Sequence, residues 1–428
     1  PSLDKLHDPF LMKDMDKAVE RLHHAITQGE KILIYGDYDV DGTTAVALMY
    51  RFLEAIRREG YEAKGAEIDY YIPDRYTEGY GVSQQGIDYA AEQGCGLIIT
   101  LDCGIKAVEK VAYAKSKGID VIVCDHHTPG DELPDAVAVL NMKREDCLYP
   151  YKDLSGCGVG FKLAQAYTQQ YGLPFDNLVP LLQLLAMSIA SDIVPITGEN
   201  RILAHYGIKQ LNTQPFTGLS AIMQVAGIEA KKITINELVY KIGPRINACG
   251  RMKSGRAAVE LLLTDDPVFA RQQAEEVNQH NDDRRDCDTE TTKEALQQLQ
   301  DDPNFAQRHS TVVYAPHWHK GVVGIVASRL TETYYLPTIV LTAGEDGIIS
   351  GSARSVGGFD IYTAIDSCSD LLTNFGGHKF AAGLSMHIDD LPEFKQRFEA
   401  YVAAHIQPNQ LQPTLDIEAE LQLGDITK

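Results

Sequence analysis

The N-terminal half of the chain repeats one pattern, in which a short apolar run ends at acidic residues and an amphipathic stretch follows. The apolar runs lie at residues 31–35, 97–101 and 119–124, with a candidate fourth at 136–140. Helical patterns follow the first two runs, at 43–56 and 107–117. Repeated strand–turn–helix units predict a parallel β-sheet with helices on both faces. Ligands of such sheets bind outside the carboxyl ends of the strands, which is where the acidic residues lie.

The rest of the chain predicts a helical region, a connector and a second α/β domain. Residues 160–193 have a helical pattern, and the polar stretch 266–302 predicts one long exposed helix. Strand patterns return at residues 311–315, 338–342 and 347–353, with a helix expected at 322–333.

We therefore expect an α/β chain with two α/β domains joined by a long helix around a central cleft. The expected boundaries are 1–265 for the parallel-sheet domain, 266–302 for the helix, 303–405 for the smaller domain and 406–428 for a linker. An alternating run at 415–423 predicts the first strand of a further domain that the chain does not complete.

The overall charge limits how this chain can bind a partner. It has 39 Lys and Arg against 60 Asp and Glu, a formal net charge of −21. Such a surface argues against whole-face binding to nucleic acid or anionic lipid, but not against an anionic substrate held locally by metal ions. No run approaches the roughly 18 apolar residues of a membrane span, and residues 1–10 lack a signal-peptide pattern. The 8 cysteines form no Cys-x-x-Cys pair, so we expect reduced thiols and a cytoplasmic location.

The strongest local signal is the stretch 36–42, which reads GDYDVDG and follows the first apolar run directly. Its three carboxylates at alternate positions repel one another at short range, so their presence needs a cause. One Asp would be explained by a helix N-cap or a solvated turn. Three between two glycines favour a divalent-cation site, because hard cations bind several carboxylate oxygens and neutralise them.

Three further polar clusters end apolar elements. Asp102 follows the second run, the triplet 125–127 (DHH) follows the third, and Asp192 ends the helical region. A lone Asp at a strand end is usually structural, but these ends converge if the sheet is parallel. Imidazole beside carboxylate suits Mn²⁺ or a similar metal better than Ca²⁺. Adjacent histidines cannot point the same way from a strand, so one can bind metal while the other faces substrate.

These side chains are numerous enough for two metal ions, with Asp102 able to bridge them. The candidate ligands are Asp39, Asp41, Asp102, His126 and Asp192. Two-metal sites carry out in-line attack on a phosphorus centre.

The motifs, in this order, resemble the DHH phosphoesterase superfamily. The segments that carry the resemblance are 37–42 (DYDVDG), 102–104 (DCG), 125–127 (DHH) and 191–195 (SDIVP). Residues 376–383 (GGHKFAAG) resemble the signature of the associated DHHA1 domain. Further matching segments lie at 72–75, 79–81, 156–161 and 243–251. The likeness runs from about residue 31 to 404 and is closest to the RecJ family of bacterial single-strand-specific exonucleases.

The resemblance implies a role for each matching residue. It implies that two divalent cations, Mn²⁺ or Mg²⁺, are bound by Asp39, Asp41, Asp102, His126 and Asp192. Asp37 becomes an auxiliary carboxylate, and His127 faces the scissile phosphate. Tyr35 departs from the pyrophosphatase relatives, which place a ligating His at this point, and this weakens a pyrophosphatase function.

One stretch reverses the acidic character of the chain. Residues 241–256 contain five basic residues and no acidic one. A solvated basic turn is the plain explanation, but the interspersed Gly and Pro favour a backbone loop that approaches phosphate. The resemblance implies that Arg251, Arg75 and Tyr80 receive the terminal 5′-phosphate, and we add Arg245 to the substrate-binding residues.

The second domain supplies further candidates. Ser352 and Arg354 lie two residues apart on one strand face, and the resemblance implies that they also reach the terminal phosphate. The expected turn at Gly377 and His378 would present backbone N–H groups and an imidazole to the strand. Residues 317–319 (HWH) fit either base stacking or buried packing at a strand end, and both alternatives stay open.

The function implied by the resemblance is a metal-dependent 5′→3′ exonuclease of single-stranded DNA that releases 5′-mononucleotides in DNA repair and recombination. The nearest alternative is a phosphodiesterase of short oligoribonucleotides or cyclic dinucleotides. A noncatalytic nucleic-acid-binding protein is disfavoured, because all five ligand positions are filled.

The expected partners follow from this function. They are single-stranded DNA with a free 5′ end, a RecQ-type helicase and a single-strand binding protein, with no membrane. We expect a monomer in the bacterial cytoplasm. The chain begins at Pro1 without a Met, so we expect a processed or partial piece, and the family implies an OB-fold after residue 415.

Overall fold

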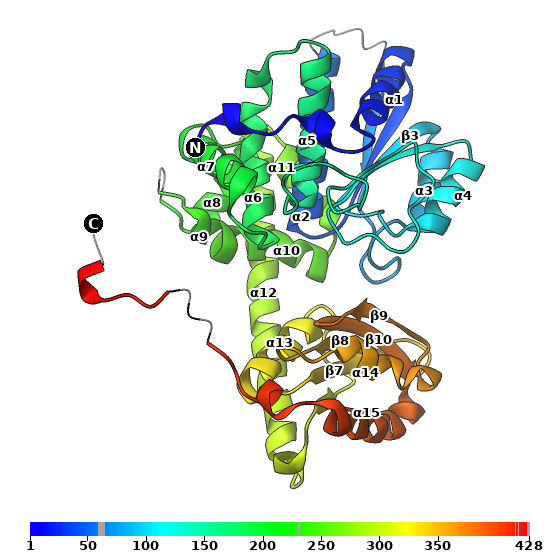
Figure 1. The fold of residues 1–428 in the computed structure, drawn as a ribbon, viewed down its shortest axis with the longest axis vertical. Coiled ribbons are helices and arrows are strands. Elements are labelled where there is room, and N and C mark those ends of the chain that lie inside the picture. Colours follow the sequence, from blue (N-terminus) through cyan, green and yellow to red (C-terminus); the bar gives the residue numbers. More distant parts are fainter. Residues whose placement is uncertain (59–64, 230–231, 416, 418, 426–428) are drawn as a thin grey trace. The chain divides into compact units, whose positions relative to one another are not determined.

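The computed structural model describes residues 1–58, 65–229, 232–415, 417 and 419–425. The chain forms two compact units, Pro1–Asp282 and Asp283–Lys428 (Figure 1). The boundary between them falls inside α12 (Pro267–Gln300), one continuous helix. The helix predicted at 266–302 is therefore confirmed.

The first unit is built on a five-stranded parallel sheet. Its strands pair in the order β2 (Ile68–Tyr71), β1 (Lys31–Gly36), β3 (Cys95–Leu101), β4 (Asp120–Cys124) and β5 (Ala138–Leu140). The central strands are continuous apolar runs because both faces of the sheet are covered. Ile32 and Ile34 face one core, whereas Leu33 and Tyr35 face another. The predicted strands and the candidate fourth are confirmed, and β2 is an addition.

Helices cover both faces of this sheet (Figure 1). On one face the core includes residues of α3 (Gln84–Glu92) and α4 (Val108–Ser116). On the other face the larger core is formed by α1 (Met15–Gln28), α2 (Val40–Arg58), α5 (Gly156–Gln170) and α6 (Leu182–Ser191). The helices expected at 43–56 and 107–117 are confirmed, and the helical region 160–193 forms α5 and α6.

The remainder of the first unit is also helical. Its elements are α7 (Gly198–Thr213), α8 (Thr217–Val225), α9 (Ile235–Glu237), a π-helix (Leu238–Ile242), α10 (Gly243–Met252) and α11 (Gly255–Leu263). The basic stretch 241–256 is therefore mostly helical, and the expected loop is wrong. Pro244 lies in the first turn of α10, where proline is tolerated. A Cβ atom at Gly250 would lie 2.6 Å from the carbonyl oxygen of Tyr38, so this glycine lets α10 pack closely against the turn after β1.

The second unit contains a mixed five-stranded sheet. Its strands pair in the order β6 (Thr311–Tyr314), β7 (Thr338–Ala343), β8 (Ile348–Arg354), β10 (Ala381–His387) and β9 (Asn374–His378). Only β6 and β7 pair in parallel within this sheet as described. Its cores include residues of α13 (Val323–Tyr334), α14 (Ile361–Asp366) and α15 (Leu391–His405). The strands and the helix predicted between 311 and 353 are confirmed.

The C-terminal run 415–423 does not form the predicted strand where it is described. Residues 416 and 418 of this run lie outside the described residues, and the others belong to no strand. Leu415 and Leu421 are exposed. Among the helices of the described residues, none is both long and apolar enough to cross a membrane.

Candidate metal centre

The polar segments predicted to converge do meet at one edge of the first sheet. The strand order β2-β1-β3-β4-β5 reverses direction between β1 and β3, the point at which ligands of open α/β sheets bind. Residues 37–41 follow β1, Asp102 follows β3, and His126 follows β4. Asp192 comes from the C-terminal end of α6.

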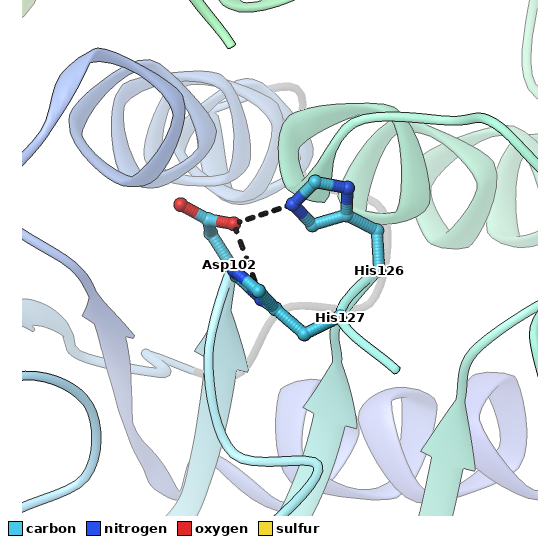
Figure 2. Close-up of side chains that lie close together, drawn as sticks. All are labelled: Asp102, His126 and His127. Carbon is cyan, nitrogen blue, oxygen red and sulfur yellow. Dashed lines mark ion pairs between the residues drawn. The ribbon is translucent and has the colours of Figure 1, made fainter. Parts of the chain in front are cut away.

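His126 lies at the centre of this group. Its Nε2 atom is 3.2 Å from Asp102 Oδ1, 3.5 Å from Asp192 Oδ2 and 3.7 Å from Asp41 Oδ2. Figure 2 shows the Asp102 carboxylate directed at both His126 and His127. We call the following set the acidic cluster: Asp37, Asp39, Asp41, Asp102, His126 and Asp192.

The ligand atoms in this region fall into three overlapping sets, each within 4.8 Å. The sets are Asp41 with His126 and Asp192, Asp37 with Asp39 and Asp102, and Asp102 with His126 and His127. The first two sets share no residue. The third set connects them, because it contains His126 of the first set and Asp102 of the second. Together they contain every predicted metal ligand and add two residues: Asp37, which the sequence made only auxiliary, and His127, which was expected to face the scissile phosphate.

The acidic cluster contains buried atoms without hydrogen-bond partners. These are Asp37 Oδ1, Asp102 Oδ1 and His126 Nε2, of which the last two lie 3.2 Å apart without the geometry of a hydrogen bond. Burial, followed by neighbouring carboxylate charges, raises the pKa of Asp37 and Asp102 well above the usual value. Burial also raises the pKa of Asp192 to about 8, with Asp41 and Asp39 adding to the effect.

Buried polar atoms usually have a partner. A divalent cation would supply one and cancel the repulsion. The carboxylate oxygens suit Mg²⁺ or Mn²⁺, and the imidazole beside them suits Mn²⁺.

The first turn of α5 holds Asp41. The Gly156 N–H donates to Asp41 Oδ2 over 2.6 Å, and the Cys157 N–H donates to Oδ1 over 2.8 Å. A helix N-terminus suits a carboxylate because its first N–H groups lack helical partners and carry partial positive charge. A Cβ atom at Gly156 would lie 2.5 Å from the Cβ atom of Asp102. Glycine therefore allows α5 to begin beside two members of the acidic cluster.

The turn after β1 is fixed by backbone N–H groups that donate to side-chain oxygens. The Gly42 N–H donates to Asp39 Oδ1 over 2.9 Å, and the Val40 N–H donates to Asn247 Oδ1, on α10, over 3.1 Å. A Cβ atom at Gly42 would lie 2.5 Å from the carbonyl oxygen of Asp37. This turn therefore requires glycine to place its carboxylates together.

His126 and His127 have different surroundings, as their adjacency requires. The His126 side chain is 9 % exposed, whereas that of His127 is 44 % exposed. His127 Nδ1 is bonded to Asp125 Oδ1 over 2.7 Å. Burial lowers the pKa of His127, but the hydrogen bond and charge of Asp125, with Asp192 and Asp41, raise it overall. His126 is thus the buried ligand candidate, and Asp125 orients the outward-facing His127.

Tyr35 is separate from the acidic cluster and has a structural contact. Its hydroxyl donates to the Gly81 carbonyl oxygen over 3.0 Å and accepts from the Ser83 N–H over 3.0 Å. It therefore anchors the loop that carries Tyr80. The Tyr80 hydroxyl in turn donates to the Asp102 carbonyl oxygen over 3.0 Å and lies 3.2 Å from His127 Nδ1.

Two of the predicted phosphate-binding arginines lie near the turn after β1. The guanidinium carbon of Arg75 is 4.9 Å from the ring centroid of Tyr38. Burial raises the pKa of Tyr38 to about 12, and the charges of Arg75 and Arg251 act against this rise. The hydroxyl of Tyr76 donates to the backbone carbonyl of Arg251. The structure thus groups Arg75 and Arg251 around two tyrosines.

Arg245 is occupied by contacts with neighbouring helices. Its Nε atom donates to Asn278 Oδ1 over 2.9 Å, and its Nη1 atom donates to the Lys241 carbonyl oxygen over 2.6 Å. Lys253 is paired with Glu276 on α12. These contacts give the basic stretch a packing role that its composition did not reveal.

Ser352 and Arg354 share one face of β8, as the alternation along a strand predicts. A Cβ atom at Gly324 of α13 would lie 3.3 Å from Ser352 Oγ and 3.0 Å from Arg354 Nη2. Both side chains therefore border the start of α13, within the second unit.

Gly377 and His378 do not form the expected turn. They end the edge strand β9, in which Gly377 pairs with Ala382 and His378 with Ala381 of β10. The hairpin turn lies one step further, at residues 379–380. The expectation was wrong because two glycines suggest a turn, whereas antiparallel pairing here extends through them.

Trp318 is buried, which is one of the two alternatives that the sequence left open. Its side chain is buried, and its Nε1 atom donates to Glu294 Oε2 over 2.8 Å. His317 Nε2 contacts the same oxygen over 2.7 Å. The indole packs in the core beside α12 and α13.

Ile193, directly after Asp192, adopts a left-handed backbone conformation with a φ of 55°. It follows the C-terminal cap of α6, a position that favours Gly or Asn because a β-branched side chain is strained there. We expect Ile193→Asn to raise the free energy of unfolding by about 1 kcal/mol, the order of the left-handed penalty, in urea denaturation. Ile193→Val keeps the branched Cβ atom and should change little. Equal stability of the Asn variant and the wild type would contradict the strain.

Three polar residues that support the acidic cluster were missed by sequence reasoning. Ser155 caps α5 by accepting from the Gly158 N–H over 3.1 Å, and a Ser before a helix is a known start signal. Ser188 and Asn247 contact positions 147 and 207 residues away in the chain. Such distant contacts leave no local signal.

Comparison with known proteins bears on the whole chain. The family models "DHH family, N-terminal domain" and "DHHA1 domain" match residues 31–189 and 309–404. The single-stranded-DNA-specific exonuclease RecJ of Bacillus subtilis is 38 % identical, over 98 % of this chain and 52 % of its own length. The chain thus spans about half the length of that relative. The Dickeya dadantii protein of the same name is 37 % identical, over 100 % of this chain and 76 % of its own length.

A solved structure gives the same match in three dimensions. A crystal structure of exonuclease RecJ bound to manganese has a TM-score of 0.82 and 33 % identity, and the match covers 96 % of this chain and 98 % of that one. The fold, the spacing of the acidic cluster and these identities lead to one assignment. The chain belongs to the RecJ family of single-stranded-DNA-specific exonucleases.

Proposed function

We propose that this chain hydrolyses single-stranded DNA from a free 5′ end, depends on two divalent cations, and releases 5′-mononucleotides. The acidic cluster carries the proposal, because three buried ligand atoms without hydrogen-bond partners lie at the carboxyl edge of a parallel sheet. Two relatives named single-stranded-DNA-specific exonuclease, and a similar structure bound to manganese, support it. Such an activity would serve DNA repair and recombination in a bacterial cell, with a RecQ-type helicase and a single-strand binding protein as partners.

Two sets of residues would hold the cations. Asp41, His126 and Asp192 form one set. Asp37 and Asp39 form the other, with Asp102 near both. Bound there, divalent cations neutralise phosphate charge and lower the pKa of water for in-line attack on phosphorus.

A cavity beside the acidic cluster supports a nucleotide-sized substrate. Its volume is about 600 Å³, and it is lined by Tyr80, Asp125, His127 and residues 81–82 and 104–110. Small-molecule sites typically measure about 300–1,000 Å³. His127 would donate from Nε2 to a phosphate oxygen of the strand, while Asp125 holds its Nδ1 atom.

The terminal 5′-phosphate would be bound by Arg75 and Arg251, with Tyr80. Ser352, Arg354, Gly377 and His378 of the second unit are further proposed contacts with the strand. A phosphate held at a fixed distance from the cations would set the step at one nucleotide, which would give the proposed polarity and product.

Product analysis on defined substrates tests this function. With Mn²⁺ or Mg²⁺, a long 5′-phosphorylated single strand should release 5′-mononucleotides from its 5′ end, and a chelator should stop the reaction. A blunt duplex should be degraded far more slowly. Cleavage of a dinucleotide without cleavage of the long strand would contradict the proposal and favour a small-substrate phosphodiesterase.

Arg251→Ala should reduce the preference for a 5′-phosphate. A charge-assisted hydrogen bond contributes about 1.5–3 kcal/mol, so we expect the rate on 5′-phosphorylated strands to fall at least about tenfold, and the rate on 5′-hydroxyl strands to fall less. Lys253→Ala is the matched control, because Lys253 is paired with Glu276. An equal loss on both substrates would show that Arg251 does not read the phosphate.

A further inference from the structure

The hydrogen bonds to Asp41 distinguish its two oxygens. Oδ1 accepts from the Cys157 N–H over 2.8 Å and from the Ser188 hydroxyl over 2.7 Å. Oδ2 accepts from the Gly156 N–H over 2.6 Å and lies 3.7 Å from His126 Nε2. A carboxylate oxygen has two lone pairs. Oδ1 is therefore saturated, and Oδ2 keeps one lone pair on the side of the acidic cluster.

Ser188 is held so that its proton points at Asp41. Its side chain is fully buried, and its Oγ atom lies 2.6 Å from that of Ser155, the capping residue of α5. Because an ionised carboxylate can only accept, the single Ser188 proton goes to Asp41, and the Ser155 hydroxyl donates to Ser188 in turn. Ser188 also lies four residues before Asp192 on α6, so one helix supplies a candidate ligand and positions another.

We propose that Ser188 restricts Asp41 to binding a cation through Oδ2 alone, and that this favours Mn²⁺ and Mg²⁺ over Ca²⁺. Mg²⁺ requires near-ideal octahedral geometry, whereas Ca²⁺ takes about six to eight oxygens and often uses a carboxylate through both oxygens. With Oδ1 occupied by two donors, Asp41 cannot bind in that two-oxygen mode. Ser188 is thus a positioning residue that sets metal preference. This inference rests on the metal site proposed above.

Metal affinity measured on the full chain tests the inference. Mn²⁺ and Ca²⁺ are titrated separately into metal-free wild type and Ser188→Ala by isothermal titration calorimetry. We expect Mn²⁺ affinity to fall roughly tenfold, the effect typical of losing a residue that supports a ligand, while Ca²⁺ affinity stays unchanged or rises. Ser188→Thr keeps the hydroxyl and should preserve the wild-type preference. The Cys side chain in Ser188→Cys is similar in size to Ser but is only a weak hydrogen-bond donor. This variant replaces Ser188→Ala in the titrations if the Ala variant fails to fold.

A second variant separates positioning from stability. Ser155→Ala removes the α5 cap but leaves the bond between Ser188 and Asp41, so it should lower thermal stability without changing the ratio of the two affinities. Equal losses of Mn²⁺ and Ca²⁺ affinity in Ser188→Ala, or no loss, would overturn the inference. A wild type that binds neither metal would instead refute the metal site itself.

Discussion

Asp102→Asn should abolish nuclease activity and at the same time make the metal-free protein more stable. The Asp102 carboxylate is buried, and its Oδ1 atom has no hydrogen-bond partner. Burial, then the charges of Asp41 and Asp39, raise its pKa well above the usual value. The Asn side chain has the same shape without the charge, so it removes carboxylate repulsion from the metal-free protein. It also removes the anionic ligand that lies near both proposed cation sets.

The expected loss of activity exceeds about a hundredfold, because residues that only support a metal ligand already contribute about 10- to 100-fold. Initial rates with Mn²⁺ and with Mg²⁺ measure it, and urea unfolding with a chelator measures stability. Asp131→Asn, at an exposed position, is the control and should alter neither. Full activity in Asp102→Asn would contradict the two-metal mechanism. A metal-free variant less stable than the wild type would contradict repulsion among the carboxylates.

Gly156→Ala should weaken metal binding and destabilise the fold together. Its Cβ atom would lie 2.5 Å from Asp102 Cβ and 2.7 Å from Asp102 Cα, and rotating a side chain cannot relieve a clash with the backbone. The first turn of α5 must therefore move away, which loosens the two N–H groups that hold Asp41. Overpacking of this kind costs about 1–3 kcal/mol, and we expect Mn²⁺ affinity to fall at least about tenfold.

Gly158→Ala provides a matched control on the same turn of the same helix. Its Cβ atom would lie 3.3 Å from Leu154 Cβ, a contact that a small side-chain shift accommodates. Because Ala is favoured over Gly in helices by about 1 kcal/mol, this variant should be as stable as the wild type or more so, with unchanged Mn²⁺ affinity. Calorimetric titration and urea unfolding of both variants make the comparison. Similar behaviour of the two would show that the close approach of Gly156 to Asp102 is unimportant.

Strands buried on both faces could be predicted from the sequence, whereas the less buried strands β2 and β9 could not. β1, β3 and β4 are buried on both faces, so each is a continuous apolar run. β2 lies at the edge of its sheet and is mostly half-buried, and β9 at the other sheet's edge is largely exposed. A weakly buried strand of this kind forms by pairing with a neighbour, and that neighbour is not visible in the strand's own residues.

The positions of the acidic cluster could be predicted because parallel strands bring their carboxyl ends together. The helical state of α10 could not, since Gly250 meets the backbone of Tyr38, a distant residue. The same holds for Ser188, whose partner Asp41 lies 147 residues away. Local patterns therefore locate the charged side chains, while the packing of α5, α6 and α10 decides how each of them is held.

The backbone N–H groups at the start of α5 hold Asp41 through hydrogen bonds made within the chain. Small zinc domains behave differently, because their chains fold only when the metal binds. Here the bonds that hold Asp41 come from the chain itself, so we expect folding to precede metal binding. Removal of the metal ion with a chelator should leave the protein folded. Re-addition of the ion should restore activity at the rate of metal binding, without a lag for rearrangement of the chain.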